Sequence, residues 1–258
     1  MTFCLGMKVS DGLVGIADTR VTTGSECITA KKVTTYQFDR SAMFLMTSGL
    51  RSVRDKALTY FDEIMESGNA PIHGRLFHVA NLFADQIRRV AREDSIYLER
   101  SQLSFNMHTL LGGQLEHDRE HKLYMIYPEG NWVEIGQGTP YHIIGASGYG
   151  KPVLDRTLKY DDTMQFALTV GCLAFDSTRI SATDVDFPLD IVLYRQNTHE
   201  IVEHRYMKDD LASITNWWQD RLRNSVRQMP LEWMDSLLAK LPDSHLSSVQ
   251  FPNTHKHA

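Results

Sequence analysis

The sequence TFCLGMKVSDGLVGIADTR, residues 2–20, carries most of the information about the fold of this chain. Its apolar residues from Phe3 to Val9 predict a short β-strand, and Ser10-Asp11-Gly12 is a turn sequence. Leu13 to Ala17 predicts a second strand. Thr2 therefore stands immediately before a strand, only one residue from the start of the chain.

Thr2 would become the N-terminal residue if Met1 were removed, and an N-terminal threonine can act as a nucleophile. Its α-amine can take the proton of its own hydroxyl, so one amino acid supplies both the nucleophile and the general base. The amine must be free, because in a chain that keeps Met1 this nitrogen is an amide without a basic lone pair. Position alone is weak evidence, since many chains have a small second residue that carries no catalysis.

Charged residues follow at a spacing that suits this chemistry. Asp18 and Arg20 come directly after the second strand, and Lys32 precedes Val33. A lysine ammonium beside an α-amine lowers the pKa of that amine from its reference value of about 7.7–8.0. Lys32 would also stabilise negative charge on the Thr2 hydroxyl, and Asp18 would keep Lys32 protonated and oriented. The alternative is a surface ion pair, which contributes about 0–1 kcal/mol in any protein.

Gly49 is a candidate for the oxyanion site. It follows the apolar run from Ala42 to Met46, where a strand is expected to give way to a helix. A backbone N–H at such a junction can stabilise the oxyanion of a tetrahedral intermediate by about 2.7–4 kcal/mol. Gly49 could equally be a turn glycine that is required for its backbone freedom.

Thr2, Asp18, Arg20 and Lys32 together resemble the active β-subunits of the proteasome, which are N-terminal threonine hydrolases. In that family an N-terminal threonine is followed by two short strands, an Asp-x-Arg sequence and a lysine. The resemblance implies that Lys32 rather than Lys31 is the active-site lysine, because the family's lysine precedes an apolar residue that starts the next strand. It also places the oxyanion glycine at a strand-to-helix junction, as at Gly49.

The segment from Ile143 to Gly148 resembles the family's Gly-Ser-Gly sequence, which brings a serine hydroxyl next to the threonine amine. This implies Ser147 as that serine, although an alignment on Ile144 and Gly145 would place Ala146 there and leave no hydroxyl. Further along the chain, the family carries an aspartate and a serine three residues apart in a loop.

Asp176 and Ser181 are the nearest matches to that aspartate and serine, but they lack the family's spacing. Residues 176–178 could equally be polar residues at the end of a helix. The start at Met-Thr without a propeptide and the tryptophans of Asn216-Trp217-Trp218-Gln219 resemble the bacterial ancestral β-subunit branch, Anbu. This likeness extends from Thr2 to Leu241.

Composition sets the broad class of the protein. The chain has 258 residues, of which 42% are hydrophobic and 23% charged, as in an ordinary globular protein with one large domain. A net charge of -5 argues against a nucleic-acid partner. Neither a signal peptide nor a run of about 18 apolar residues is present, so we expect a cytoplasmic protein without a membrane partner. Three cysteines without CxxC spacing indicate neither a disulfide framework nor a metal site, and no cofactor is indicated.

The order of expected elements predicts an α+β fold, a four-layer αββα sandwich of the N-terminal nucleophile hydrolase type. Strands are expected at 3–17 (with the turn), 33–38, 42–47, 105–112, 122–126, 132–135, 142–144, 190–195 and 201–206. Helices are expected at 50–67, 76–98, 151–158 and 164–175. We expect residues 2–207 to form this domain, residues 208–241 a C-terminal helical extension, and residues 242–258 a disordered tail.

Two classes of function remain open from the sequence. The first is a threonine-type peptidase in a ring or spiral of its own copies, or a related amidohydrolase that acts on small amides. The second is a non-catalytic assembly subunit, which a retained Met1 would favour. The sequence does not separate peptide from small-amide substrates, and it leaves open an ATP-dependent unfoldase partner.

Overall fold

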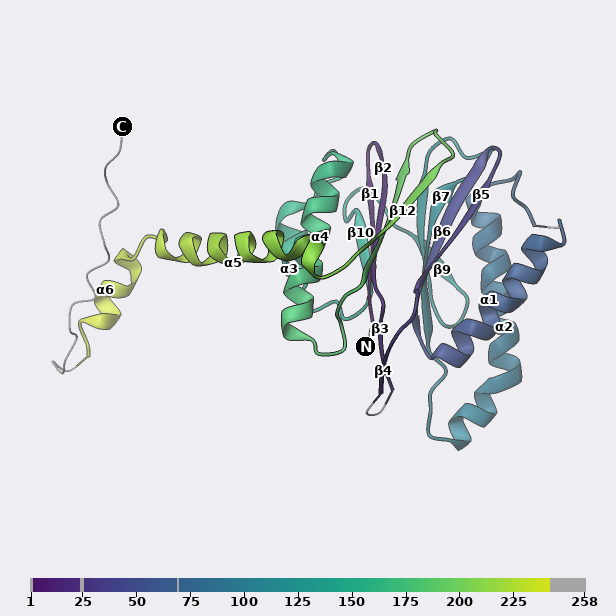
Figure 1. Ribbon diagram of the computed structural model, residues 1–258, viewed down its shortest axis with the longest axis horizontal. Coiled ribbons are helices and arrows are strands. Elements are labelled where there is room, and N and C mark those ends of the chain that lie inside the picture. Colours follow the sequence, from purple (N-terminus) through teal and green to yellow (C-terminus); the bar gives the residue numbers. More distant parts are fainter. Residues whose placement is uncertain (1, 24–25, 69, 242–258) are drawn as a thin grey trace. The chain divides into compact units, whose positions relative to one another are not determined.

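The computed structural model describes residues 2–23, 26–68 and 70–241. Two antiparallel sheets lie face to face in its first compact unit, residues 1–215 (Figure 1). In sheet order, the first sheet consists of β10 (Tyr141–Gly145), β1 (Phe3–Val9), β2 (Gly12–Asp18), β11 (Leu189–Arg195) and β12 (Ile201–Tyr206). The second consists of β5 (Val33–Phe38), β6 (Ser41–Gly49), β7 (Met107–Gln114), β8 (Lys122–Ile126) and β9 (Trp132–Glu134).

Helices cover the outer face of each sheet (Figure 1). The second sheet packs against α1 (Arg51–Glu66) and α2 (Leu76–Arg100), and the first against α3 (Lys151–Thr157) and α4 (Met164–Ser181). The four layers confirm the predicted αββα sandwich. Most of the expected strands and helices agree with the observed ones to within two residues.

The side chains of β1 alternate between two apolar clusters, one on each face of the first sheet. Phe3, Leu5 and Met7 pack into the cluster beneath α3 and α4, whereas Cys4 points into the cluster between the two sheets. Successive side chains of a strand point to opposite faces, so a strand covered on both sides needs apolar residues at every position. Each large side chain buried in this way contributes about 1.5–3 kcal/mol.

The structure corrects two sequence expectations. No strand was predicted between residues 18 and 32, where the structure has an antiparallel pair of strands, β3 (Arg20–Thr23) and β4 (Glu26–Thr29). The helix expected to end at Phe175 continues to Ser181. Its polar side chains are satisfied along the helix itself, since Ser177 and Thr178 donate to carbonyl groups four residues earlier.

The C-terminal region is helical, as predicted. A short 3-10 helix (Asp209–Leu211) precedes α5 (Ala212–Arg227) and α6 (Glu232–Leu238). The chain divides into two compact units between Thr215 and Asn216, and this boundary lies inside α5. The expected boundary at residues 207 and 208 stays a prediction, and the tail expected to be disordered lies outside the described residues. Over the part of the chain that the structure describes, no helix is long and apolar enough to cross a membrane.

A buried histidine ties the two sheets together near one end of β1. His121 is fully buried, and its Nε2 lies 2.8 Å from the carbonyl oxygen of Val9. That contact requires a proton on Nε2, while Nδ1 has no hydrogen-bond partner among the described residues. Burial lowers the pKa of His121 below its ordinary value, so the folded protein holds this ring neutral.

We predict that His121→Gln reduces the loss of stability at mildly acidic pH. The unfolded histidine binds a proton near pH 6.5 but the folded one does not, so stability falls as pH drops below that value, by at most about 1.36 kcal/mol per pH unit for one group. A glutamine amide can still donate to Val9 and does not titrate. Urea denaturation at pH 7.5 and 5.5 measures the difference. An equal loss of unfolding free energy in both proteins would show that His121 is not responsible.

Candidate active site

The start of β1 is fixed by backbone contacts on two sides. The Thr2 carbonyl oxygen accepts a hydrogen bond of 2.7 Å from the N–H of Ala146, at the end of β10. On the other side, the N–H of Phe3 donates to Asp18 Oδ1 at 2.8 Å. Thr2 is therefore held between β10 and the end of β2, and its backbone has little freedom to move.

Gly145 makes the approach of β10 to Thr2 possible. A side-chain carbon at this position would lie 1.9 Å from the Thr2 carbonyl oxygen and 3.3 Å from Ser48 Oγ. Its φ of +91° also lies in the region that only glycine adopts readily. The absence of a side chain at Gly145 is thus a geometric condition for the position of Thr2.

Asp18 and Lys32 form a buried ion pair next to Thr2. Lys32 Nζ lies 2.6 Å from Asp18 Oδ1 and 2.7 Å from the carbonyl oxygen of Arg20, and the two side chains are 2% and 0% exposed. Burial raises the pKa of Asp18 above its ordinary value, against the opposing effect of Lys32 and the Phe3 N–H. Removing either partner of such a pair leaves a buried charge uncompensated, at a cost of about 3–5 kcal/mol.

The two neighbouring lysines have different surroundings. Lys31 points away and pairs with Glu203 of β12 at 2.6 Å, whereas Lys32 lines the cavity that also contains Thr2. Because successive residues of an extended segment point in opposite directions, only one of the two can face the cavity.

Gly49 is the last residue of β6 and lines the same cavity. Leu50 donates its N–H to Asn106 across the sheet, while Thr47 donates its N–H to the carbonyl oxygen of Lys32 on the opposite side. N–H groups alternate in direction along a strand, so the Gly49 N–H points to the Lys32 side, beyond the end of β5. Gly49 has a φ of +137°, and a side-chain carbon there would lie 2.1 Å from the Asn106 carbonyl oxygen.

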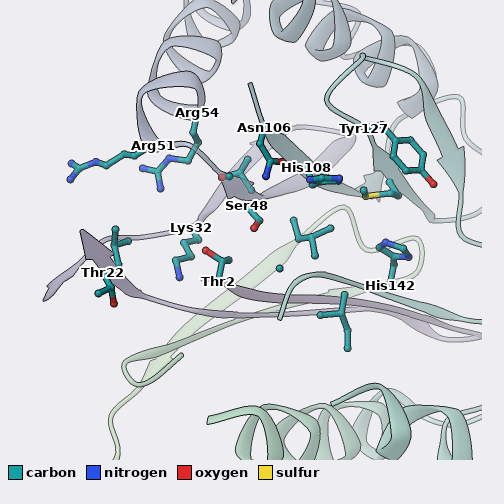
Figure 2. Close-up of a pocket in the computed structure, with 17 residues that line it drawn as sticks. Thr2, Thr22, Lys32, Ser48, Arg51, Arg54, Asn106, His108, Tyr127 and His142 are labelled. Atoms are coloured by element: carbon teal, nitrogen blue, oxygen red, sulfur yellow. The ribbon is translucent and has the colours of Figure 1, made fainter. Parts of the chain in front are cut away.

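These groups line one cavity of about 570 Å³, a volume that is typical of small-ligand sites. Figure 2 shows Thr2 near its centre, with Lys32, Arg51 and Arg54 toward one end and His108 and His142 toward the other. Among the described residues that line it, none carries a carboxylate. The arrangement offers a hydroxyl, an ammonium group and a backbone donor to one substrate carbonyl.

The family model described as "Proteasome subunit" matches residues 2–184, which is most of the chain. The chain belongs to the proteasome subunit family. No curated protein sequence matches it.

Three solved structures that are similar to this proteasome-family chain each cover 88% or more of it. Anbu from Pseudomonas aeruginosa, described as a helical assembly, is 27% identical with a TM-score of 0.83, over 88% of this chain and 97% of that one. Anbu from Yersinia bercovieri is 27% identical with a TM-score of 0.80, over 95% and 99%. A Gly-1 mutant of Anbu from Hyphomicrobium sp. strain MC1 is 28% identical with a TM-score of 0.82, over 89% and 98%.

Of the remaining predicted site residues, some lie next to the cavity and others do not. Arg20 contributes its carbonyl oxygen to Lys32, while its guanidinium pairs with Asp186. Ser147 does not line the cavity, and its carbonyl oxygen accepts a hydrogen bond from the N–H of Lys151. Gly145 and Ala146 occupy the position beside Thr2, in agreement with the alternative alignment that left no hydroxyl there.

Asp176 and Ser181 lie outside the cavity lining, on α4 rather than in a loop. Asp176 is buried and accepts hydrogen bonds of 2.7 Å from both Arg179 and Thr215. Ser181 is the exposed last residue of the helix. A carboxylate with two partners of its own stabilises the packing around α4, so the observed role of Asp176 is structural.

Sequence reasoning missed a hydroxyl at the centre of the cavity. Ser48 lines the cavity between β6 and Thr2, as Figure 2 shows. Its position directly before Gly49 was the only signal in the sequence. It also missed His108 and His142, which stand on strands of different sheets and share no sequence motif.

The two buried cysteine thiols are not competing nucleophiles for Thr2. Cys4 is close by, with its sulfur 3.8 Å from the Thr47 carbonyl oxygen, but burial raises the pKa of its thiol far above the usual range. Burial also raises the pKa of Cys172 to about 11. Both thiols are therefore protonated at neutral pH. The described residues contain no cluster of three or more metal-ligating side chains.

We predict that Gly145→Ala destabilises the protein by about 1–3 kcal/mol and displaces Thr2. The added methyl group cannot coexist with the Thr2 carbonyl oxygen at its observed position. Gly148→Ala is the matched control, because a side-chain carbon there meets no atom within 4 Å. Chemical denaturation measures both variants, and equal stability of the two would contradict the close approach.

Proposed function

We propose that this chain is an N-terminal threonine hydrolase that cleaves amide bonds, with Thr2 as the nucleophile after removal of Met1. The observation that carries the proposal is the buried Lys32, which Asp18 holds in place and which opens into the same cavity as Thr2. An uncompensated ammonium would not stay buried, so the pair positions a cation beside the nucleophile. Membership of the proteasome subunit family supports the same reaction class.

The chemistry follows from these positions. The Thr2 hydroxyl oxygen attacks the substrate carbonyl while its proton passes to the free α-amine, and the negative charge moves to the carbonyl oxygen. The Gly49 N–H stabilises this oxyanion. The amine then gives its proton to the departing nitrogen as the carbon–nitrogen bond breaks, which leaves an ester on Thr2. Water hydrolyses the ester by the same steps and restores the hydroxyl.

Lys32 has two effects in this sequence of steps. Its positive charge favours the neutral form of the α-amine, which must accept the proton, and it stabilises developing charge on the Thr2 oxygen. Asp18 acts through Lys32 and through the Phe3 N–H, so we propose it as a positioning residue. Arg20, through its carbonyl oxygen, is proposed as a second one.

We also propose that the chain associates with copies of itself. Nine of the nineteen exposed large apolar side chains among the described residues fall between Trp217 and Leu241. The half-buried Trp218 and the exposed Leu222 and Val226 share one face of α5, since they are spaced by four residues. Exposed apolar patches of this kind mark contact surfaces. The similar Anbu structure from Pseudomonas aeruginosa is described as a helical assembly, which supports this proposal.

We predict that Thr2→Ala lowers hydrolysis by at least about 1000-fold without a change in folding, because the side chain contributes chemistry and little packing. Thr2→Ser keeps a hydroxyl and is the matched control, which should retain measurable turnover. A peptide library and a set of small amides, assayed on protein whose intact mass shows loss of Met1, provide the measurement. Undiminished turnover by Thr2→Ala would rule out the proposed nucleophile.

We predict that a chain ending at Thr215 forms smaller assemblies than a chain ending at Leu241. The shorter chain keeps Thr215, which bonds Asp176, and Leu211, which packs on the core. It loses the exposed apolar side chains of the second unit. Light scattering gives the mass of each species, and far-ultraviolet circular dichroism checks that both are folded. An unchanged mass would assign self-association to the first unit.

A further inference from the structure

Arg51 and Arg54 line one end of the Thr2 cavity, and Figure 2 shows Lys32 and Thr22 at the same end. We refer to these four lining residues as the arginine end of the cavity. Both arginines lie in the first turn of α1, three residues apart, so they share one face of the helix. The wall at this end is therefore built from a helix terminus and two guanidinium groups.

The two arginines share a single carboxylate, that of Asp55. Arg51 Nε lies 3.3 Å from Asp55 Oδ2, and the guanidinium of Arg54 lies 2.9 Å from Oδ1. A guanidinium stays protonated in proteins, so two permanent positive charges meet one negative charge. Lys32 does not change this balance, because Asp18 pairs with it. The arginine end is thus left with an excess of positive charge.

The next charged groups have partners of their own. Asp186 pairs with Arg20 at 3.2 Å, and Asp184 interacts with Thr22 and with Arg20. Neither acid lines the cavity. The N-terminus of α1 adds to the positive field, because Leu50 provides no side-chain cap and the first turn contains no acidic residue. Such a terminus acts as about half a positive charge.

The guanidinium groups differ in the donors that they can still offer. Arg54 is 18% exposed, and its nitrogens bind Asp55 and the carbonyl oxygen of Lys31, the latter at 3.2 Å. Arg51 is 56% exposed and binds Asp55 through Nε, while its two terminal nitrogens have no partner in the described part of the chain. Two such nitrogens can bind a carboxylate together. Arg54 therefore supplies a fixed charge, and Arg51 supplies free donors.

The arginine end lies close to the place where a substrate carbonyl would react. Arg51 follows Gly49, the proposed oxyanion donor, by two residues. Two residues of chain span at most about 7 Å. A substrate group next to the reacting carbonyl is therefore within reach of the arginines.

We propose that the arginine end selects a carboxylate group of the substrate, with Arg51 as its direct donor and Arg54 as the fixed charge behind it. This inference rests on the proposed function for the identity of the ligand as a substrate, but the binding itself does not require catalysis. A cationic group would be repelled by the excess charge. A neutral amide could accept the same hydrogen bonds but would gain nothing from that charge. The carboxylate can belong to an acidic side chain or to a free C-terminus.

Permanent charges give this selection two measurable properties. The preference for a carboxylate over an amide should stay constant between pH 6 and 8.5, since neither the guanidinium groups nor the ligand carboxylate titrate there. It should decrease as salt is added, because the arginine end is open to solvent and the screening length falls from about 10 Å at 0.1 M salt to about 3 Å at 1 M.

The Thr2→Ala protein allows the test, since it cannot turn over its ligand by the proposed route. Calorimetric titration would use three probes: acetyl-Ala-Ala-Gln-amide, acetyl-Ala-Ala-Glu-amide, and acetyl-Ala-Ala-Gln with a free carboxylate. The glutamine and glutamate probes have nearly the same shape and differ in charge. We expect at least one acidic probe to bind about tenfold more tightly than the neutral one at low salt. The acidic probe that gains affinity identifies the source of the carboxylate.

Variants on the Thr2→Ala background locate the carboxylate within the cavity. Arg51→Gln and Arg54→Gln should each reduce the preference to about threefold or less, whereas Asp55→Asn, which removes the shared carboxylate, should increase it. Arg92→Gln is the matched control and should keep the full preference, because it removes the same charge from an exposed site on α2 that does not line the cavity.

Several results would overturn the inference. They are equal affinity for the charged and neutral probes, no measurable binding of any probe, a preference that survives both arginine substitutions, and a preference that strengthens as pH falls. Arg54→Gln also removes the hydrogen bond to the Lys31 carbonyl oxygen. If that variant fails to fold, the opposite effects expected for Arg51→Gln and Asp55→Asn decide the question, and equal effects of these two would count against the site.

The outcome is separable from that of the proposed function. A Thr2 protein that hydrolyses nothing, together with a Thr2→Ala protein that prefers an acidic probe through Arg51, would refute the hydrolase and leave the carboxylate site intact. Hydrolysis with equal rates for glutamate and glutamine substrates, and equal affinity for the matching probes, would give the reverse.

Discussion

A single buried oxygen atom, Asp18 Oδ1, connects the start of the chain to the lysine of the site. It accepts hydrogen bonds from the Phe3 N–H and from Lys32 Nζ, at 2.8 and 2.6 Å. The residue after Thr2 and the ammonium of Lys32 are therefore positioned by the same group. A charge buried in this way is stable only while both partners are present, so the local geometry is determined cooperatively.

The cavity exists because two sheets contribute different parts of it. The first sheet supplies Thr2 and His142, and the second supplies Gly49 and His108. Apolar packing between the sheets sets the distance between these groups, while the polar groups lie where that packing ends. This division explains how a core made of interchangeable apolar side chains can hold a small set of polar atoms at fixed separations.

Family membership shows the fold of this chain, but it does not show which substrate the chain binds. Similar Anbu structures share this fold with TM-scores of 0.80–0.83 at only 27–28% identity. Such similarity is expected, because many apolar sequences satisfy the same pattern of buried faces. What this chain binds depends on the side chains that line its own cavity and not on the fold alone.

Sequence patterns were enough to predict most of the strands and helices and their order along the chain. Continuous apolar runs such as Phe3 to Val9 predict strands buried on both faces, and helical periodicity predicts α1 and α2. The resemblance to proteasome β-subunits indicated Thr2, Asp18 and Lys32, and it was visible in the sequence because all three lie within one short segment. The polar hairpin β3–β4 was not predicted, since it has no alternation of apolar residues. Whether Asp176 lies in a loop or at the end of a helix stayed open from the sequence, because the end of α4 has no glycine or proline signal.

The surroundings of Thr2 became visible only in the folded structure. The register between β10 and β1 pairs Phe3 with Gly145 and brings the N–H of Ala146 to the Thr2 carbonyl oxygen, whereas Ser147 does not line the cavity. The fold also brought Ser48, His108 and His142 to one cavity from strands of two sheets. Sequence patterns report how one segment divides between core and solvent, whereas contacts between distant strands depend on register and sheet packing, which no local pattern encodes.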